Sequence, residues 1–407
     1  MGNTSLVSYY NKNSQYNFSI LAFVCFLISP ILSLPFILLG IFNRERLSLF
    51  LTSLFIGVLS YYLIPAWELD ISRYYLMYQE ISMSNYNGFK LIVAEQNDYV
   101  FFFLYYLLSR FGISFQFLLL IISTFNFYTC LLVGDLILKR SKASRNSYFM
   151  LMGSLILSLP ILSMVSVSRF ALAFSFFMLF VYYHLKKNTK LSYSFMALSC
   201  FTHFAFAVYV PFLVLFNFYT NRTKINRMLM VICFFVLVFT ATGGLLNVLQ
   251  RIPIIGEKAM IYLDVFEESN IFILSMMLLI PMIISVFFYM RFYSFIPTQV
   301  LQIFLACLIV ALICIPTNMI IYDRYIQVFK PVFALTIMAT CYSPNIVSSA
   351  KILLLKKIVF IVTIFYAMYY FYTFYIIYKD SFRGFISLSK LLLISILDSS
   401  YTQHDFY

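Results

Sequence analysis

The feature that most constrains this chain is a series of long apolar runs separated by polar loops. A helix needs about 20 predominantly apolar residues to cross the hydrocarbon core of a bilayer. The candidate spans are residues 18–42, 47–66, 113–138, 147–161, 164–184, 191–216, 228–248, 271–290, 296–319, 326–342 and 357–377. The sequence therefore predicts an all-α, polytopic integral membrane protein with about eleven transmembrane helices. We expect a single membrane-embedded domain over residues 1–407, and at 99–109 a short interfacial or partly buried helix.

Composition and charge exclude other classes of protein. Charged residues make up 11% of the 407 positions, whereas a soluble domain carries about 25%. The net charge of +13 could suggest nucleic-acid binding, but most cations cluster in short loops between apolar runs. That distribution is typical of the positive-inside rule, so no nucleic-acid partner is expected. The seven cysteines have irregular spacing and no CxxC pair, so neither a disulfide framework nor a metal site is predicted.

The loops between the runs predict a topology. The cation-rich loops are 43–46, 139–145, 186–190, 222–227 and 351–357. Short cationic loops mark the cytoplasmic side of a membrane protein. The long acid-bearing loops, 67–112 and 249–270, are then expected outside, and residues before the first run also face outward. The C-terminal tail, 378–407, is expected to be amphipathic or disordered.

The run 191–216 conflicts with this scheme, because loops at both of its ends are cationic. Either one end breaks the rule and the run is an ordinary crossing, or the run enters and returns, with His203 and Pro211 near its turn. The ordinary crossing is the commoner arrangement and is therefore the prediction. A broken segment would itself indicate a functional site, because non-helical backbone at membrane depth is tolerated only where it lines protein or water.

Two ionisable residues, Arg169 and His203, lie inside long apolar stretches. A charged side chain at the centre of a helix costs roughly 2.5–3.5 kcal/mol on insertion scales, so it usually faces a polar cavity or a ligand. A guanidinium binds phosphate or diphosphate in a bidentate manner. The alternatives are that Arg169 caps a helix in the headgroup zone and that His203 is a core histidine bonded between helices. No second histidine or acid follows His203 at i+3 or i+4 to form a metal site.

A polar stretch after the second run presents a further candidate site. On a helix, Asp70, Tyr74 and Tyr78 share one face, and Arg73 lies three residues from Asp70. The functional interpretation is a carboxylate, a guanidinium and phenols at an external membrane surface. The alternative is an interfacial amphipathic helix with a local ion pair and anchoring aromatic residues.

Two cations near the start of a late span form another candidate site. Arg324 lies in the sequence Tyr-Asp-Arg-Tyr, and Lys330 lies further inside the apolar stretch. Two such cations could hold an anionic lipid or a diphosphate. The alternative is an interfacial helix end in which Asp323 neutralises Arg324.

These motifs together resemble the EpsG-like branch of the Wzy-type O-antigen and capsule polysaccharide polymerases. The resemblance depends on Asp-x-x-Arg-Tyr-Tyr at 70–75, on Ser-Arg-Phe-Ala-Leu-Ala at 168–173, and on the following helix that carries His203. The sequence Asp-Arg-Tyr at 323–325 is a looser match. The resemblance implies a GT-C-like fold in the bacterial cytoplasmic (inner) membrane.

The resemblance also implies a reaction, which is glycosyl transfer on the outer face of that membrane. The donor would be an undecaprenyl-diphosphate-linked oligosaccharide, and the acceptor a sugar hydroxyl on a second lipid-linked repeat unit. No cofactor or metal is expected, because the leaving group is already on the lipid. Partners would be this substrate and the lipid bilayer, and could include a chain-length regulator.

By this analogy each candidate residue receives a role. Arg169 and Arg324 would bind the diphosphate, since cations must stabilise the departing group. His203 or Asp70 would be the base or would position the hydroxyl. Arg73 and Tyr74 would shape the sugar site.

Two other classes of protein are compatible with the sequence. A flippase for lipid-linked oligosaccharide usually has short loops and two repeated halves, whereas this chain has two long external loops and no detectable repeat. A membrane O-acyltransferase would need a catalytic histidine, which His203 could imitate.

Overall fold

The structure is a computed structural model that describes residues 17–61, 70–94, 98–160, 168–218, 271–314 and 319–341, with a few isolated positions between 357 and 368. Its elements are α1 (Phe18–Ile28), α2 (Pro30–Phe42), α3 (Arg46–Tyr61), α4 (Asp70–Met83), α5 (Tyr86–Ala94), α6 (Tyr99–Arg110), α7 (Phe115–Arg140), α8 (Arg145–Ser158), α10 (Ser168–Leu185), α11 (Thr189–Thr202), η1 (Phe204–Val208), α12 (Tyr209–Phe218), α16 (Ile271–Phe292), η2 (Tyr293–Phe295), α17 (Thr298–Cys314) and α18 (Met319–Cys341). Every described element is a helix, which confirms the all-α prediction.

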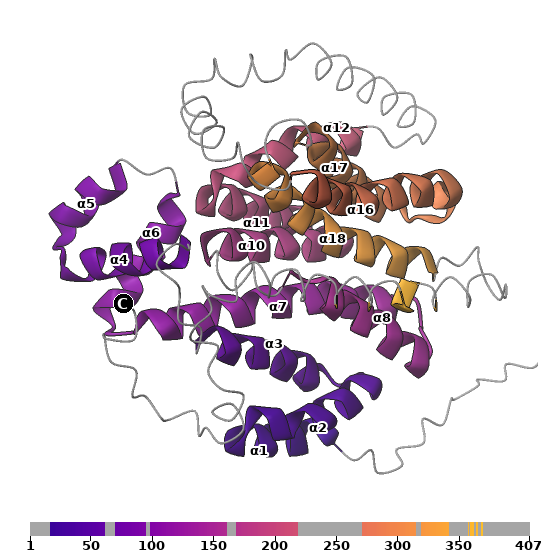
Figure 1. The fold of residues 1–407 in the computed structure, drawn as a ribbon, viewed down its shortest axis with the longest axis horizontal. Helices are drawn as coiled ribbons and strands as arrows, with labels where there is room; N and C mark the ends of the chain where they lie inside the picture. Colours follow the sequence, from indigo (N-terminus) through magenta and orange to yellow (C-terminus); the bar gives the residue numbers. More distant parts are fainter. Residues whose placement is uncertain are drawn as a thin grey trace, which may run out of the picture.

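Helix α7 is the centre of the bundle. It packs against α3 on one side and against α10 and α18 on the other, and α4 to α6 form a separate group at one end (Figure 1). By length and composition, two of the described helices, α7 and α10, could cross a membrane. Five other predicted spans correspond to the helices α3, α8, α16, α17 and α18. The predicted span 228–248 and most of 357–377 lie outside the described residues.

Three turns between consecutive helices lie together at the other end of the bundle. They join α2 to α3, α7 to α8, and α10 to α11. Arg44 Nη2 donates to the carbonyl of Ala143, and Arg140 Nη1 donates to the carbonyl of Leu185 over 2.7 Å. These contacts bring three of the cation-rich loops side by side, and we call this end of the bundle the cationic end.

The first apolar run is a helical hairpin. Ser29, which precedes Pro30, is extended with φ −156° and ψ 122°, because the proline ring disfavours the α region for the residue before it. The helices on either side, α1 and α2, pack against each other. They have 11 and 13 residues, so they are only about 16 and 20 Å long, short of the roughly 30 Å of a hydrocarbon core.

Both ends of this hairpin lie at the cationic end. The backbone N–H of Ser19 donates to Glu45 Oε2 over 2.7 Å, which places the start of α1 beside the turn that follows α2. Asn17 therefore lies on the same side as the loop 43–46. The prediction of one crossing at 18–42 is wrong for this reason, whereas the residues that precede Asn17, predicted to face outward, lie outside the described part of the chain.

The run 191–216 is also broken. Helix α11 lies antiparallel to α10, because Ser192 Oγ donates to the Phe180 carbonyl over 3.3 Å and Ser199 Oγ to the Ala173 carbonyl over 2.8 Å. The helix ends at His203, where the backbone is extended with φ −152° and ψ 111°. His203 thus lies near the first turn of α10 and not at mid-depth.

After His203 the chain returns. Gln302 Nε2, one turn into α17, donates to the carbonyl of Phe216 near the end of α12. Gln299, in the same turn of α17, donates to the carbonyl of His184 at the cationic end of α10. The end of α12 and the start of α11 therefore lie at the same end of the bundle. The ordinary crossing predicted for this run is wrong, and Pro211 lies within α12, past the turn.

The two hairpins predict which residues share a side of the bilayer. Single cysteines at Asn17, Arg145 and Asn87, all exposed positions, would be placed in a chain without its native cysteines and reconstituted in sealed vesicles. We expect a membrane-impermeant maleimide to label Asn17→Cys and Arg145→Cys from one side, and Asn87→Cys from the other. Labelling of Asn17→Cys together with Asn87→Cys would show that the first run crosses.

Candidate functional site

A buried carboxylate, Asp98, lies immediately before α6. Asp98 is 5% exposed, and its side chain does not cap its own helix. A buried carboxylate is costly unless it is paired and hydrogen-bonded. Asp98 meets this requirement by contacting two other elements, α10 and the break after α11.

The first partner of Asp98 is Arg169, in the first turn of α10. Arg169 Nη1 lies 2.6 Å from Asp98 Oδ2. A positive charge at a helix N-terminus is opposed by the helix dipole, so this guanidinium needs a nearby anion. Its central carbon also lies 5.3 Å from the centre of the Tyr74 ring, a cation–π contact.

The second partner is the break at His203. The backbone N–H of Phe204 donates to Asp98 Oδ1 over 3.1 Å, and His203 Nδ1 lies 3.5 Å from the same oxygen. The side chain of His203 does not cap η1. The carboxylate of Asp98, which is distant in the sequence, caps this helix instead by accepting from the Phe204 N–H. We call Asp98, Arg169, His203 and Tyr74 the Asp98 cluster.

These contacts keep Asp98 ionised. Burial acts to raise the pKa of the Asp98 carboxyl, but the hydrogen bond with His203, the charge of Arg169 and the Phe204 N–H act to lower it. Together the lowering contributions prevail, so the pKa lies below its ordinary value. Asp98 is therefore an anion at neutral pH.

Aromatic residues of α4 and α6 support the cluster. Tyr74 and Tyr78 lie one turn apart and are both buried, as predicted for one face of a helix. The Tyr78 hydroxyl donates to the carbonyl of Ile113, and its ring packs edge-on against Tyr105. The Tyr105 hydroxyl in turn lies 3.3 Å from Ser168 Oγ, at the start of α10. This chain of contacts fixes α4 and α6 against the helix turn that carries Arg169.

The other sequence candidates on α4 are placed differently. Asp70 is the first residue of α4, one turn before Tyr74 on the same face, but its side chain is outside the described part of the structure. The side chain of Arg73 is exposed at the surface of α4.

Helix α18 approaches the break with Arg324 and Tyr325. The Tyr325 hydroxyl donates to the carbonyl of Ala205 over 3.2 Å. Arg324 lies close enough for its charge to act on the His203 ring. Lys330 is buried about 7 Å further along α18, and its direction differs from that of Tyr325 by roughly 140° around the helix.

Sequence reasoning missed Asp98 and found Arg169, His203 and Tyr74. Asp98 was grouped with the acid-bearing loop, although it directly precedes the short apolar segment 99–109. An acid at the start of an apolar helix was the available signal. Its partners lie 71 and 106 positions away, at Arg169 and Phe204.

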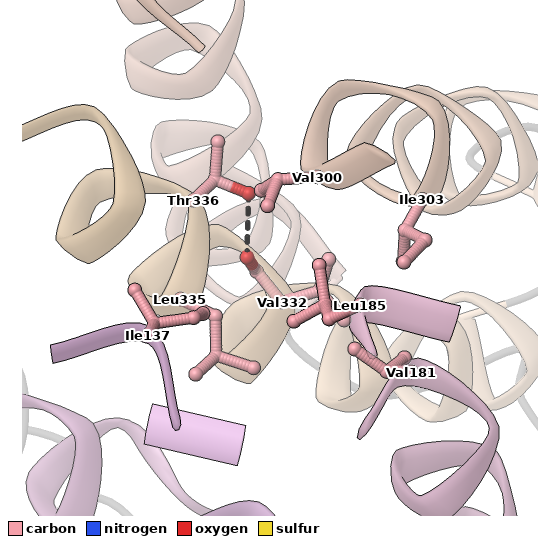
Figure 2. A pocket seen from close by; sticks show the side chains of 8 residues that line it. All are labelled: Ile137, Val181, Leu185, Val300, Ile303, Val332, Leu335 and Thr336. Atoms are coloured by element: carbon pink, nitrogen blue, oxygen red, sulfur yellow. Dashed lines mark hydrogen bonds between the residues drawn. The ribbon is translucent and has the colours of Figure 1, made fainter. Parts of the chain in front are cut away.

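A small cavity lies elsewhere, between α7, α10, α17 and α18 (Figure 2). Its lining consists of Ile137, Val181, Leu185, Val300, Ile303, Val332, Leu335 and Thr336. The only polar side chain in that lining, Thr336, donates its hydroxyl to the carbonyl of Val332 over 2.7 Å. Val181 is twelve residues from Arg169, about 18 Å along α10. This gap is therefore separate from the Asp98 cluster and apolar in character.

The replacement Asp98→Asn tests how much the cluster depends on its carboxylate. The variant leaves Arg169 without its anion, so we expect the free energy of unfolding in detergent at pH 7 to fall by about 3 kcal/mol. The exposed acid Glu80 on α4 provides the matched control, Glu80→Gln, which should change stability by less than about 0.5 kcal/mol.

The same variant has a pH signature. Because the pKa of Asp98 is lowered on folding, its stabilisation is complete above the ordinary aspartate value of 3.8 and is lost as the pH falls through the folded value. The difference between the two proteins should therefore shrink only below about pH 3.8. A difference that disappears near pH 6 would contradict this assignment.

The sequence of most of the chain, including this cluster, is similar to one family of known proteins. A model of the EpsG family matches residues 48–387, which include all the residues of the Asp98 cluster. No curated protein and no solved structure matches the chain. Because the family match covers far more than half of the sequence, the chain belongs to the EpsG family, a polysaccharide-polymerase type of membrane protein.

Proposed function

We propose that the protein is a glycosyltransferase that polymerises undecaprenyl-diphosphate-linked oligosaccharide repeat units into O-antigen or capsular polysaccharide. The observation that carries this proposal is the Asp98 cluster, in which a carboxylate holds a guanidinium and contacts an imidazole. The cluster lies at the end of the bundle opposite the cationic end. By the positive-inside rule, that end faces outward from the bacterial cytoplasmic (inner) membrane.

A multi-pass topology in a GT-C-like fold is part of the proposal. Of the eleven predicted segments, 18–42 and 191–216 are hairpins, which leaves nine crossings. With nine crossings we expect all five cation-rich loops on one side and both long acid-bearing loops, 67–112 and 249–270, on the other, although 222–227, 249–270 and 351–356 lie outside the described residues. This agreement supports the topology, because the conflict around 191–216 disappears once the segment returns.

The proposed reaction exchanges one bond for another. The hydroxyl oxygen of the acceptor sugar attacks the anomeric carbon of the donor, the bond from that carbon to the diphosphate breaks, and undecaprenyl diphosphate leaves. Negative charge develops on the diphosphate, and Arg169 and Arg324 stabilise it. Arg169 uses Nη1 for Asp98, but a guanidinium has five N–H donors, so it can bind an anion at the same time. Lys330 is a further cation proposed for the substrate, but it is buried on a different face of α18 from Tyr325 and would act apart from the Asp98 cluster.

The acceptor proton goes to His203 in this proposal. Its Nδ1 faces Asp98, which leaves Nε2 for the acceptor hydroxyl, as in other sites where a carboxylate orients a histidine base. Asp98 is thus a positioning residue. Asp70 remains the alternative base, and Arg73 and Tyr74 shape the sugar site. The partners are the lipid-linked oligosaccharide, the bilayer and a chain-length regulator.

A flippase for the same lipid-linked oligosaccharide is the second candidate. Transport would need a polar path between the helices, and the cavity described above does not supply one. In the described part of the bundle, the cavity among α7, α10, α17 and α18 is lined by apolar side chains and one internally bonded threonine (Figure 2). A membrane O-acyltransferase is the third candidate and rests on His203 alone.

The replacements Arg169→Lys and His203→Gln test the polymerase. With purified protein and lipid-linked repeat units, we expect His203→Gln to slow chain extension by roughly 100-fold or more, because general base catalysis typically contributes 10²–10⁴. Arg169→Lys keeps the charge but loses the bidentate fork, so extension should also fall strongly. The products are read as a ladder on a polysaccharide gel.

The matched control is Lys90→Gln, which removes an exposed cation from α5 and should leave the ladder unchanged. In cells, loss of polymerase activity should leave single repeat units on the surface. If His203→Gln and Arg169→Lys give full-length chains at normal protein levels, the assigned roles are wrong. If deletion of the protein abolishes the appearance of single units as well, it is a flippase.

A further inference from the structure

Three helices at the cationic end finish with a cation in the left-handed conformation. Arg44, Lys142 and Lys187 have φ of 64°, 52° and 62°. In each turn, the N–H of the next residue returns to a carbonyl five positions earlier, as in a Schellman motif. These bonds run from Glu45 to Gly40, from Ala143 to Leu138, and from Asn188 to Tyr183.

Glycine is the usual residue at such a position, because a side chain is strained there. The fourth left-handed residue in the described part of the chain is Gly112, and it follows α6 at the opposite end. The chain therefore uses glycine in the turn between α6 and α7 and a strained cation in three turns at the cationic end. In α7, stabilisation of the helix dipole does not account for this choice, since Lys139 and Arg140 already lie in its last turn.

The three turns form one continuous basic surface, because Arg44 and Arg140 link them through backbone carbonyls. The surface contains Arg44, Arg46, Lys139, Arg140, Lys142, Arg145, Lys186, Lys187 and Lys190. Two acids lie within it. Glu45 accepts from the backbone of α1, and Asp135, 1% exposed, holds Arg46 and Lys139. The cations of the surface outnumber these two acids, so its net charge is positive. Lys142 and Lys187 are exposed at the tips of their turns.

We infer that this basic surface binds the headgroups of anionic phospholipids in the leaflet that it adjoins. The three turns lie where apolar helices end, which is the depth of the headgroups. The α1–α2 hairpin, whose two ends lie next to these turns, exposes Leu38 and, further from the turns, Leu27 and Leu32, so acyl chains have an apolar surface that leads away from the phosphates. A lysine ammonium is a compact charge with three donors that suits a phosphodiester. An anionic leaflet attracts such clusters at short range.

The test separates charge from backbone strain with two double variants of the full chain in neutral detergent. Phosphatidylglycerol should raise the Tm of the wild-type protein, and phosphatidylcholine should not. Lys142→Gly with Lys187→Gly should raise the lipid-free Tm by about 2 °C or more, because glycine removes the strain, and should lose most of the phosphatidylglycerol shift. Lys142→Gln with Lys187→Gln should lose the same shift without any gain in lipid-free Tm.

Two controls define the outcomes. Lys90→Gln removes one cation from α5 and should keep the full phosphatidylglycerol shift. Inorganic phosphate at the same concentration should not raise the wild-type Tm. If phosphate alone gives the full shift, the surface binds a free anion and the lipid assignment is overturned. If either double variant retains the wild-type shift, the two lysines do not bind the headgroups and the inference fails.

Discussion

The contacts of the Asp98 carboxylate determine how the helices are arranged at the end of the bundle opposite the cationic end. One buried group contacts both the N-terminus of α10 and the break between α11 and η1. Arg169 sits where the helix dipole opposes a positive charge, and η1 begins at a residue whose own side chain does not cap it. Both defects are corrected by the same anion. The contacts of the cluster therefore depend on one another, because removing one partner leaves another buried polar group unpaired.

The break at His203 satisfies the backbone hydrogen bonds of a helix end and also places the His203 ring among charged groups. A helix that ends inside an apolar bundle exposes backbone groups that must find partners. Here the N–H of Phe204 finds Asp98, and the Ala205 carbonyl accepts from Tyr325. The same bonds bring the His203 ring next to a carboxylate and near the charge of Arg324. An unbroken helix would not have gathered these groups around one histidine.

Much of the helical architecture follows from the lengths of the apolar runs. Two of the three ionisable residues Asp98, Arg169 and His203 follow from the cost of inserting such residues into a membrane. Arg169 and His203 stand out because each is ionisable in an apolar stretch, and Tyr74 follows from the spacing on α4. Asp98 was not predictable in the same way, since an acid in a polar loop is ordinary and only its burial makes it unusual. Its pairing joins positions about 70 and 105 residues apart, which no local pattern records.

The hairpins were missed for a different physical reason. A run of 25 apolar residues satisfies the length of one crossing and also of two short helices that pack on each other. For 18–42 the available signal was Pro30, because a proline disfavours the helical conformation of the residue before it, and Ser29 is extended. For 191–216 the signal was the cationic loop at each end, which a returning segment satisfies and a crossing does not.

The two ends of the bundle use positive charge in opposite ways, and this difference follows from burial. At the Asp98 end, Arg169 is mostly buried and so requires a buried anion within bonding distance. At the cationic end, Asp135 satisfies Arg46 and Lys139, but Lys142 and Lys187 project from strained turns into the surroundings. Exposed cations need no protein partner, so their charge remains available to the bilayer. The fold thus pairs its buried acids with cations at both ends and leaves an excess of exposed cations at one end, which is the asymmetry that orients a helical bundle in a membrane.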